Sequence, residues 1–236
     1  MKKGFTLIEL LIAILLFGFM AMSLATIYST AHKHLFQNYR QNTVKAGASV
    51  AMKAITSRLQ QSNRIDLPLS GGSGNILAFA VNVDQRSGCY PVNPDTPSLT
   101  AWHYFCYLPG VTAQCPLGNC LFYHTGPITG GSGCPSGTVW NTANGYPVAG
   151  NCGQITRPGE AVPLLLSSFV YPAPSLFSRP TSGINTLGNS VVNINLRVYW
   201  DPWAQVVSGV KDFRSTSRLI DVTLNTNVRV IRSGQN

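Results

Sequence analysis

The sequence has few charged residues. Asp, Glu, Lys and Arg make up 11% of the 236 residues, which is less than half of the usual share of about a quarter. Acidic residues are the scarcer kind, with 8 against 17 basic residues, and the formal net charge is +9. A basic balance is compatible with nucleic acid, anionic lipid or an acidic protein surface as a partner.

The sequence also lacks the short motifs of nucleotide-binding and hydrolytic sites. It contains no Walker loop and no dinucleotide fingerprint. Two glycine-rich pieces, residues 71–75 and 130–134, depart from the G-x-S-x-G pattern at its last position and are interpreted as flexible turns. We therefore expect neither enzymatic activity nor a cofactor.

No proline occurs before Pro68, and residues 10–28 contain no charge. These 19 residues are about enough to span a bilayer as a helix. A secretory signal peptide is one interpretation, because Lys2 and Lys3 precede the run and residues 23–25 (Ser-Leu-Ala) form a small-x-small site. The length of the apolar run and the carboxylate of Glu9 at its start argue against a signal peptide. An ordinary single-span anchor is a second possibility.

A third interpretation starts from the stretch Gly4-Phe5-Thr6-Leu7-Ile8-Glu9. Followed by the apolar run, it resembles the class III signal of type IV pilins and pseudopilins. The resemblance implies that a prepilin peptidase cuts after Gly4 on the cytoplasmic side and that the new N-terminal residue, Phe5, is N-methylated. It also implies residence in the inner membrane before assembly, and assembly with other pilin or pseudopilin subunits through the N-terminal helix.

Glu9 is the one charged residue between Lys3 and Lys33. A charged side chain at a bilayer centre costs on the order of 2.5–3.5 kcal/mol, so we expect this residue to have a function. The resemblance implies that Glu9 of one subunit pairs with the Phe5 amine of a neighbour. Desolvation offsets much of the attraction, so such a pair would set axial register rather than supply stability. The alternative is that Glu9 only forms part of the peptidase recognition sequence.

Helix-forming residues continue beyond the apolar run. Apolar residues recur there at helical spacing and predict a stripe that packs on a core. The stripe consists of Val44, Ala48, Met52, Ile55 and Leu59. We predict one helix from about Phe5 to about Ser62, with an apolar first half and an amphipathic second half.

The segment between residues 10 and 65 carries cations and no anion after the apolar run. The cations are Lys33, Arg40, Lys45, Lys53, Arg58 and Arg64. They form either a solvated face or a basic ridge that meets acidic surfaces of other subunits, or anionic lipid headgroups near Lys33. Nucleic acid is a weaker alternative, because no stacking aromatic residues are interleaved with the cations.

Period-two alternation predicts strands in the second half of the chain. Residues 191–200 and 219–231 alternate between apolar and polar, as expected for antiparallel strands with one buried face. Further strands are expected at residues 75–83, 102–108, 120–124 and 163–171. The prediction is a pilin-like α+β fold, with the long helix packed on an antiparallel sheet. This pattern also resembles the larger, PilW-type minor pilins and the J-type pseudopilin of type II secretion.

All six cysteines lie in the stretch 87–160, which is rich in glycine and proline. An even number of cysteines in such a stretch indicates disulfides formed in an oxidising compartment. The sequence alone does not choose the pairing, and we predict a sequential one. The predicted pairs are Cys89–Cys106, Cys115–Cys120 and Cys134–Cys152.

A zinc site is the alternative use of these cysteines. Cys115 and Cys120 have an allowed spacing, and His103 or His124 could complete the ligand set. No paired second motif follows, and an exported protein favours disulfides. We therefore expect no metal.

These observations divide the chain into a cleaved leader (1–4), an apolar helix half (5–28), an amphipathic helix half (29–66) and a β-rich domain (67–236) containing a loop-rich, disulfide-linked insert (87–160). The resemblance implies a minor pilin of a type IV pilus, acting in pilus assembly, adhesion, motility or DNA uptake. It would lie in the bacterial inner membrane with its globular domain in the periplasm, and after assembly at the cell surface. A pseudopilin of a type II secretion system, and an exported binding domain on a plain anchor, are the alternatives.

Overall fold

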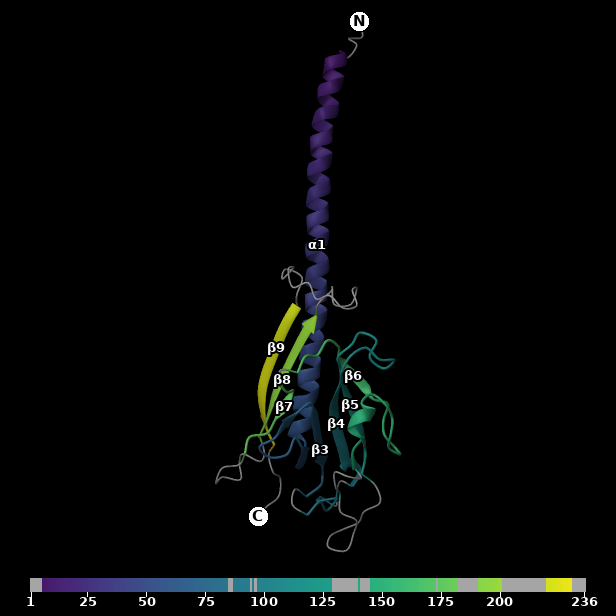
Figure 1. Cartoon of the computed structure of the whole chain (residues 1–236), viewed down its shortest axis with the longest axis vertical. Coiled ribbons are helices and arrows are strands. Elements are labelled where there is room, and N and C mark those ends of the chain that lie inside the picture. The colour runs from purple at the N-terminus through teal and green to yellow at the C-terminus, as the bar shows by residue number, and fades with distance from the viewer. Residues whose placement is uncertain are drawn as a thin grey trace. The chain divides into compact units, whose positions relative to one another are not determined.

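The computed structural model describes residues 6–84, 87–93, 95, 97–128, 140, 145–172, 174–181, 191–200 and 220–230. They form one α-helix, nine strands and two short 3-10 helices (Figure 1). The chain divides into two compact units, Met1–Thr43 and Val44–Asn236. Each unit is considered by itself. The described residues of the first unit are helical from Leu7 onward, and the second unit contains the end of that helix and the nine described strands.

The helix α1 spans Leu7–Gln60. It passes through both units without a proline, as the sequence predicts. Its last turn is closed by Ser62, whose backbone N and side-chain Oγ both donate to the carbonyl of Leu59, at 3.1 and 2.7 Å. These two bonds satisfy one of the carbonyl groups that a helix end leaves without a partner. The helix ends at Gln60, two residues before the predicted end.

Five strands form the first antiparallel sheet, called sheet A, in the order β1-β3-β4-β5-β6. Their bounds are β1 Arg64–Leu67, β3 Ile76–Val81, β4 Ala101–Leu108, β5 Cys120–Pro127 and β6 Leu164–Ser167. The short strands expected within residues 87–160 are therefore the central strands β4 and β5 of this sheet. The cysteine-rich segment is part of the main fold, rather than a loop-rich addition to its edge.

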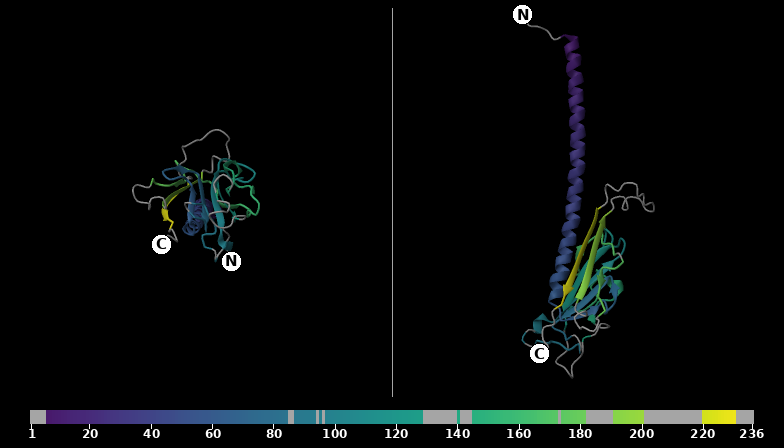
Figure 2. Two further views of the ribbon diagram at one scale, coloured as in Figure 1. Left: turned by 90° about the horizontal axis from the view of Figure 1, so that it is seen from below. Right: turned by 90° about the vertical axis from the view of Figure 1, so that its left-hand side faces the viewer.

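Four strands form the second antiparallel sheet, called sheet B, in the order β2-β7-β8-β9 (Figure 2). Their bounds are β2 Ser73–Gly74, β7 Phe177–Ser178, β8 Val191–Trp200 and β9 Ile220–Arg229. The alternation predicted for residues 191–200 is confirmed, because the even-numbered residues from Val192 to Val198 are buried.

The two sheets replace the single sheet that the sequence predicts. The reason lies after β6, where Phe169 adopts a positive φ of 62°, a conformation that is rare for a bulky side chain and ends the strand. Val170 then forms a bridge with Val198 of β8. The predicted strand 163–171 is thus a short strand in sheet A followed by a crossing to sheet B.

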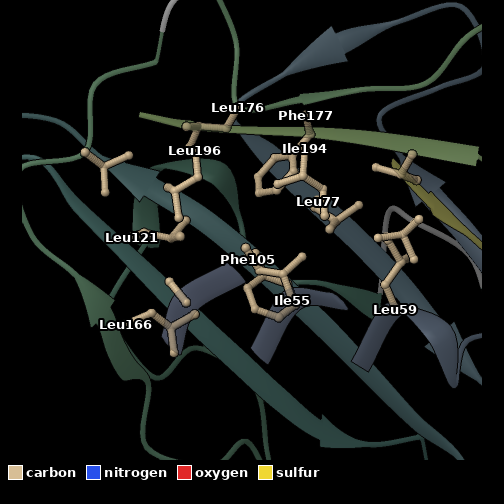
Figure 3. Packing of buried hydrophobic residues seen from close by; sticks show 14 of the residues in the cluster. Ile55, Leu59, Leu77, Phe105, Leu121, Leu166, Leu176, Phe177, Ile194 and Leu196 are labelled. Atoms are coloured by element: carbon tan, nitrogen blue, oxygen red, sulfur yellow. The ribbon is translucent and has the colours of Figure 1, made fainter. Parts of the chain in front are cut away.

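Residues 44–60 of α1 pack against both sheets. Ala48, Ala51, Ile55 and Leu59 are fully buried, and Val44 and Met52 are partly buried at the edge of the same core. In Figure 3, Ile55 and Leu59 of α1 meet Phe105 and Leu77 of sheet A and Ile194 of sheet B. Full burial of one such leucine or isoleucine stabilises the fold by about 1.5–3 kcal/mol. The predicted helical stripe is confirmed as the side of α1 that the two sheets cover.

A second core lies on the face of sheet A that points away from α1. It contains Trp102 and Tyr104 of β4, Phe122 of β5, and Tyr146 and Cys152 from the segment 145–160 that covers this face. The short 3-10 helix η2 (Ala149–Asn151) belongs to the cover, and η1 (Pro97–Leu99) precedes β4. The three inner strands of sheet A, β3, β4 and β5, are therefore largely buried on both faces.

Candidate assembly helix and disulfide-linked face

The helix α1 starts with a reciprocal cap made by Thr6 and Glu9. The backbone N of Thr6 donates to Oε2 of Glu9 at 2.9 Å, and its hydroxyl donates to the same oxygen at 2.8 Å. In return, the backbone N of Glu9 donates to Oγ1 of Thr6 at 3.4 Å. This is the capping-box arrangement, in which the N-cap and N3 residues satisfy each other's backbone donors.

The cap gives Glu9 a role that the sequence interpretation missed, although Thr6-Leu7-Ile8-Glu9 fits the T-x-x-E signature of a capping box. The carboxylate lies in the first turn, where the helix dipole favours negative charge. Among the residues that the structure describes, the other oxygen, Oε1, has no hydrogen-bond partner. Glu9 is exposed, so a donor on another molecule can reach that oxygen.

Large apolar side chains are exposed on every side of α1 in the first unit. They include Leu7, Ile8, Leu10, Leu11, Ile12, Ile14, Leu15, Leu16, Phe17, Phe19, Met20, Met22, Leu24 and Ile27. A helix that is apolar all round belongs in a membrane or among other helices, and α1 is long and apolar enough to cross a membrane. The hydroxyls of Ser23, Thr26 and Thr30 donate to carbonyls one turn earlier, at 2.9 Å each, so they are satisfied within the helix.

The structure corrects two of the predicted disulfides. Cys106 is bonded to Cys152, so the predicted pairs Cys89–Cys106 and Cys134–Cys152 are wrong. The predicted pair Cys115–Cys120 is present. Cys89 is also disulfide-bonded, and Cys134 lies outside the described residues. The sequential prediction failed because β4 and β5 are paired strands, which places Cys106 beneath the covering segment rather than near its neighbours in sequence.

A buried histidine and glutamate lie beside the Cys106–Cys152 bond. Nδ1 of His124 is 2.6 Å from Oε1 of Glu160, and both side chains are completely shielded from solvent. Nε2 of His124 lies 3.5 Å from Sγ of Cys106 and accepts the backbone N–H of Gly153 at 3.0 Å. The disulfide and this pair both join sheet A to the segment that covers it.

The side chains that the sequence offers as possible zinc ligands have other partners in the fold. Cys115 and Cys120 are bonded to each other, and Nδ1 of His103 lies 2.7 Å from the hydroxyl of Tyr123. The two sulfurs of the Cys106–Cys152 bond and Nε2 of His124 lie within 4.8 Å of one another, but the sulfurs are joined to each other. Burial lowers the pKa of His103 to about 4, with a further contribution from the charge of Arg58.

A buried tyrosine closes the outer core. The hydroxyl of Tyr146 donates to Oδ2 of Asp66 at 2.6 Å, while Arg64 Nε donates to the other oxygen of that carboxylate at 2.7 Å. Burial raises the pKa of Tyr146 well above its usual value, and the charge of Asp66 adds to the effect. Arg157 donates to the carbonyl of Tyr146 with two nitrogens, at 2.6 and 3.1 Å.

The N-terminal segment of the chain, which includes the start of α1, matches a known family model. Residues 1–25 match the family model described as the prokaryotic N-terminal methylation motif. No curated protein and no solved structure matches the chain. The chain therefore carries the class III signal of the type IV pilin and pseudopilin superfamily, on a pilin-like α+β fold. This signal implies processing by a prepilin peptidase and pilin-like assembly, and together with the apolar helix it indicates a membrane-anchored, exported, pilin-like protein.

Proposed function

We propose that this chain is a minor pilin of a type IV pilus, a structural filament subunit that acts in the priming or tip complex. The observation that carries the proposal is the capped carboxylate of Glu9 at the start of a helix whose next 19 residues, 10–28, contain no other charge and expose large apolar side chains. Such a helix can anchor the subunit in the inner membrane and then pack against the helices of other subunits. Disulfides in the globular domain suit a module exposed outside the cell.

The cut after Gly4 would leave Phe5 as an N-terminal residue with a cationic, methylated amine. The capping box survives the cut, because the Thr6 N–H remains part of an amide with Phe5. Oε2 of Glu9 is occupied by Thr6, and Oε1 would then accept the Phe5 amine of a neighbouring subunit. In an apolar surrounding this contact selects one axial register, because every other register leaves a charge without a partner.

The N-terminus of the mature protein tests the proposal directly. We expect mass spectrometry of the protein from its native membrane to find a chain that starts at N-methylated Phe5. A chain that starts at Met1, or after Ala25, would instead establish a plain anchor or a cleaved signal peptide.

A pseudopilin of a type II secretion system would share the same mature N-terminus, so a second measurement is needed. Deletion of a minor pilin reduces the number of surface filaments recovered by shearing and leaves protein secretion intact. Deletion of a pseudopilin blocks secretion through the outer membrane. Loss of secretion with normal filaments would overturn the pilus assignment in favour of the secretion system.

A further inference from the structure

Strand β9 is an edge strand with an open row of backbone groups. Asn195 N donates to Leu176 O, and Tyr199 N donates to Phe169 O, so the odd-numbered residues of β8 direct their backbone groups away from β9. The even-numbered residues of β8 therefore bond to the even-numbered residues of β9 that oppose them, such as Leu196 and Leu224.

The odd-numbered residues of β9 consequently point their N–H and C=O groups out of the sheet. They are Asp221, Thr223, Asn225, Asn227 and Arg229. No other strand among the described residues pairs with this edge. Natural edge strands are commonly blunted by proline, by short length or by a central charge. β9 is ten residues long, has no proline, and carries its only charges near its two ends.

A groove of about 550 Å³ runs beside this edge, between β9 and the flank of α1. Met52 and Leu224 supply its apolar lining, and Lys53, Thr56 and Asn225 supply polar groups. Residues at intervals of three and four positions lie on one side of a helix, so the lining residues of α1 form a continuous stripe next to the buried one. They are Ser49, Met52, Lys53, Thr56, Ser57 and Gln60. Lys53 is exposed, and none of the described residues that line the groove is acidic.

We propose that β9 is a docking edge for an extended strand of another subunit of the same assembly, which lies in this groove as the next strand of sheet B. The occupant must be a strand, because only a peptide backbone offers donors and acceptors at the spacing of the open row. Its alternate side chains would face Met52 and Leu224, and a carboxylate on it would meet Lys53. Naming another filament subunit as the source rests on the function proposed above.

Amide hydrogen exchange on the full-length chain tests the open edge first. In the detergent-solubilised chain, we expect the amides of Thr223, Asn225 and Asn227 to exchange fast and those of Leu224 and Thr226 to exchange slowly. In the assembled filament, the three outward amides become protected. Slow exchange of these three amides in the free chain would show that the edge is already covered, and fast exchange in the filament would show that nothing docks there. Either result overturns the proposal.

A backbone substitution tests the same edge by function. Asn225→Pro removes one outward N–H and leaves the bonds between β8 and β9 intact, as proline on the solvent side of an edge strand allows. We expect roughly tenfold less of this variant in the filament fraction than of the matched Asn225→Ala variant, the upper range for one lost hydrogen bond. Equal incorporation of the two variants would overturn the proposal.

A charge reversal keeps the test valid if Asn225→Pro does not fold. Lys53→Glu should lower incorporation, whereas Lys45→Glu, on the same helix but outside the groove, should not. Equal effects of the two substitutions would contradict docking in the groove.

If the wild-type chain is itself absent from filaments, the proposed function fails, and the named occupant fails with it. Normal incorporation of wild type and of Lys53→Glu refutes the docking edge alone.

Discussion

Nδ1 of His124 lies 2.6 Å from Oε1 of Glu160, and neither side chain is accessible to solvent. Because the N–H of Gly153 donates to Nε2, that nitrogen is an acceptor, and the ring proton is on Nδ1. Glu160 also accepts the backbone N–H groups of Thr156 and Arg157, at 2.8 and 2.9 Å. The contact is therefore an imidazole N–H that donates to a buried carboxylate, whose other oxygen accepts two backbone N–H groups, and it ties β5 to the segment that covers sheet A.

We predict that Glu160→Gln destabilises the protein by about 2–3 kcal/mol, the cost of leaving a buried polar group unsatisfied. An amide oxygen can still accept from Thr156 and Arg157, but the amide nitrogen then faces the N–H of His124. Moving the ring proton to Nε2 would only transfer the conflict to Gly153. The free energy of unfolding in urea measures the effect.

The matched control for this substitution is Asp221→Asn, the same chemical change in an exposed pair. The Arg197–Asp221 pair has side chains that are 33% and 40% exposed, and its hydrogen bond to Arg197 lowers the pKa of Asp221. Exposed ion pairs contribute about 0–1 kcal/mol. A loss for Asp221→Asn as large as that for Glu160→Gln would contradict the role given to burial.

A second prediction concerns acid stability and His103. Burial lowers the pKa of this imidazole to about 4 from its ordinary value of 6.5. The unfolded chain therefore binds a proton between these values that the folded chain does not, and stability falls as the pH is lowered from about 6.5 to about 4. The fall attributable to His103 is about 3 kcal/mol. Urea unfolding of His103→Gln should show a correspondingly flatter pH profile over this range.

His32 supplies the control for that measurement. It lies on the exposed surface of α1, where its ring contacts Tyr28 and Phe36. His32→Gln removes an imidazole without changing the buried core, and it should leave the acid slope of the wild type unchanged. An unchanged slope in His103→Gln would assign the acid sensitivity to another group.

The features that the sequence predicted well are those governed by local periodicity. The helical stripe from Val44 to Leu59 and the alternation along β8 follow from spacing alone, because one face of each element is buried. β1 was missed because Arg64–Leu67 is only four residues long and shows no alternation. The capping box at Thr6 is visible in the sequence as T-x-x-E, whereas the family resemblance assigns Glu9 to an intermolecular contact or to the peptidase recognition sequence.

Features that depend on long-range pairing could not be predicted. The division into two sheets depends on the positive φ at Phe169, and nothing in that residue type signals such a conformation. The buried pair of His124 and Glu160 joins residues 36 positions apart. The same holds for Cys106 and Cys152, whose pairing depends on which segment covers sheet A.

A third prediction separates the two described disulfides by the length of chain that each one closes. Cys106–Cys152 spans 46 positions and Cys115–Cys120 spans 5. In the loop-entropy model, the first contributes about 4 kcal/mol and the second about 2 kcal/mol to stability. Paired Cys→Ala variants, unfolded in guanidinium chloride, should lose stability in that order. The opposite order would mean that restriction of the unfolded chain is not the main effect.

The last prediction separates the two roles of Glu9, as the cap of α1 and as the partner of a neighbouring amine. Glu9→Gln keeps an acceptor for the N–H of Thr6, because glutamine also serves in a capping box, but it removes the negative charge. Thr6→Ala removes the hydroxyl and keeps the charge, at a cost of about 0.5–2 kcal/mol in helix stability. If the charge sets the register, Glu9→Gln is cleaved normally yet is depleted from filaments, while Thr6→Ala still assembles.

The mature N-terminus must be measured for both variants, so that a failure of processing is not mistaken for a failure of assembly. Normal assembly of Glu9→Gln together with depletion of Thr6→Ala would mean that the cap alone matters. Loss of cleavage in Glu9→Gln would mean that the carboxylate belongs to the peptidase recognition sequence. Only depletion of a correctly cut and methylated Glu9→Gln chain supports a charge contact between subunits, because the cap is intact and only the partner of the Phe5 amine is missing.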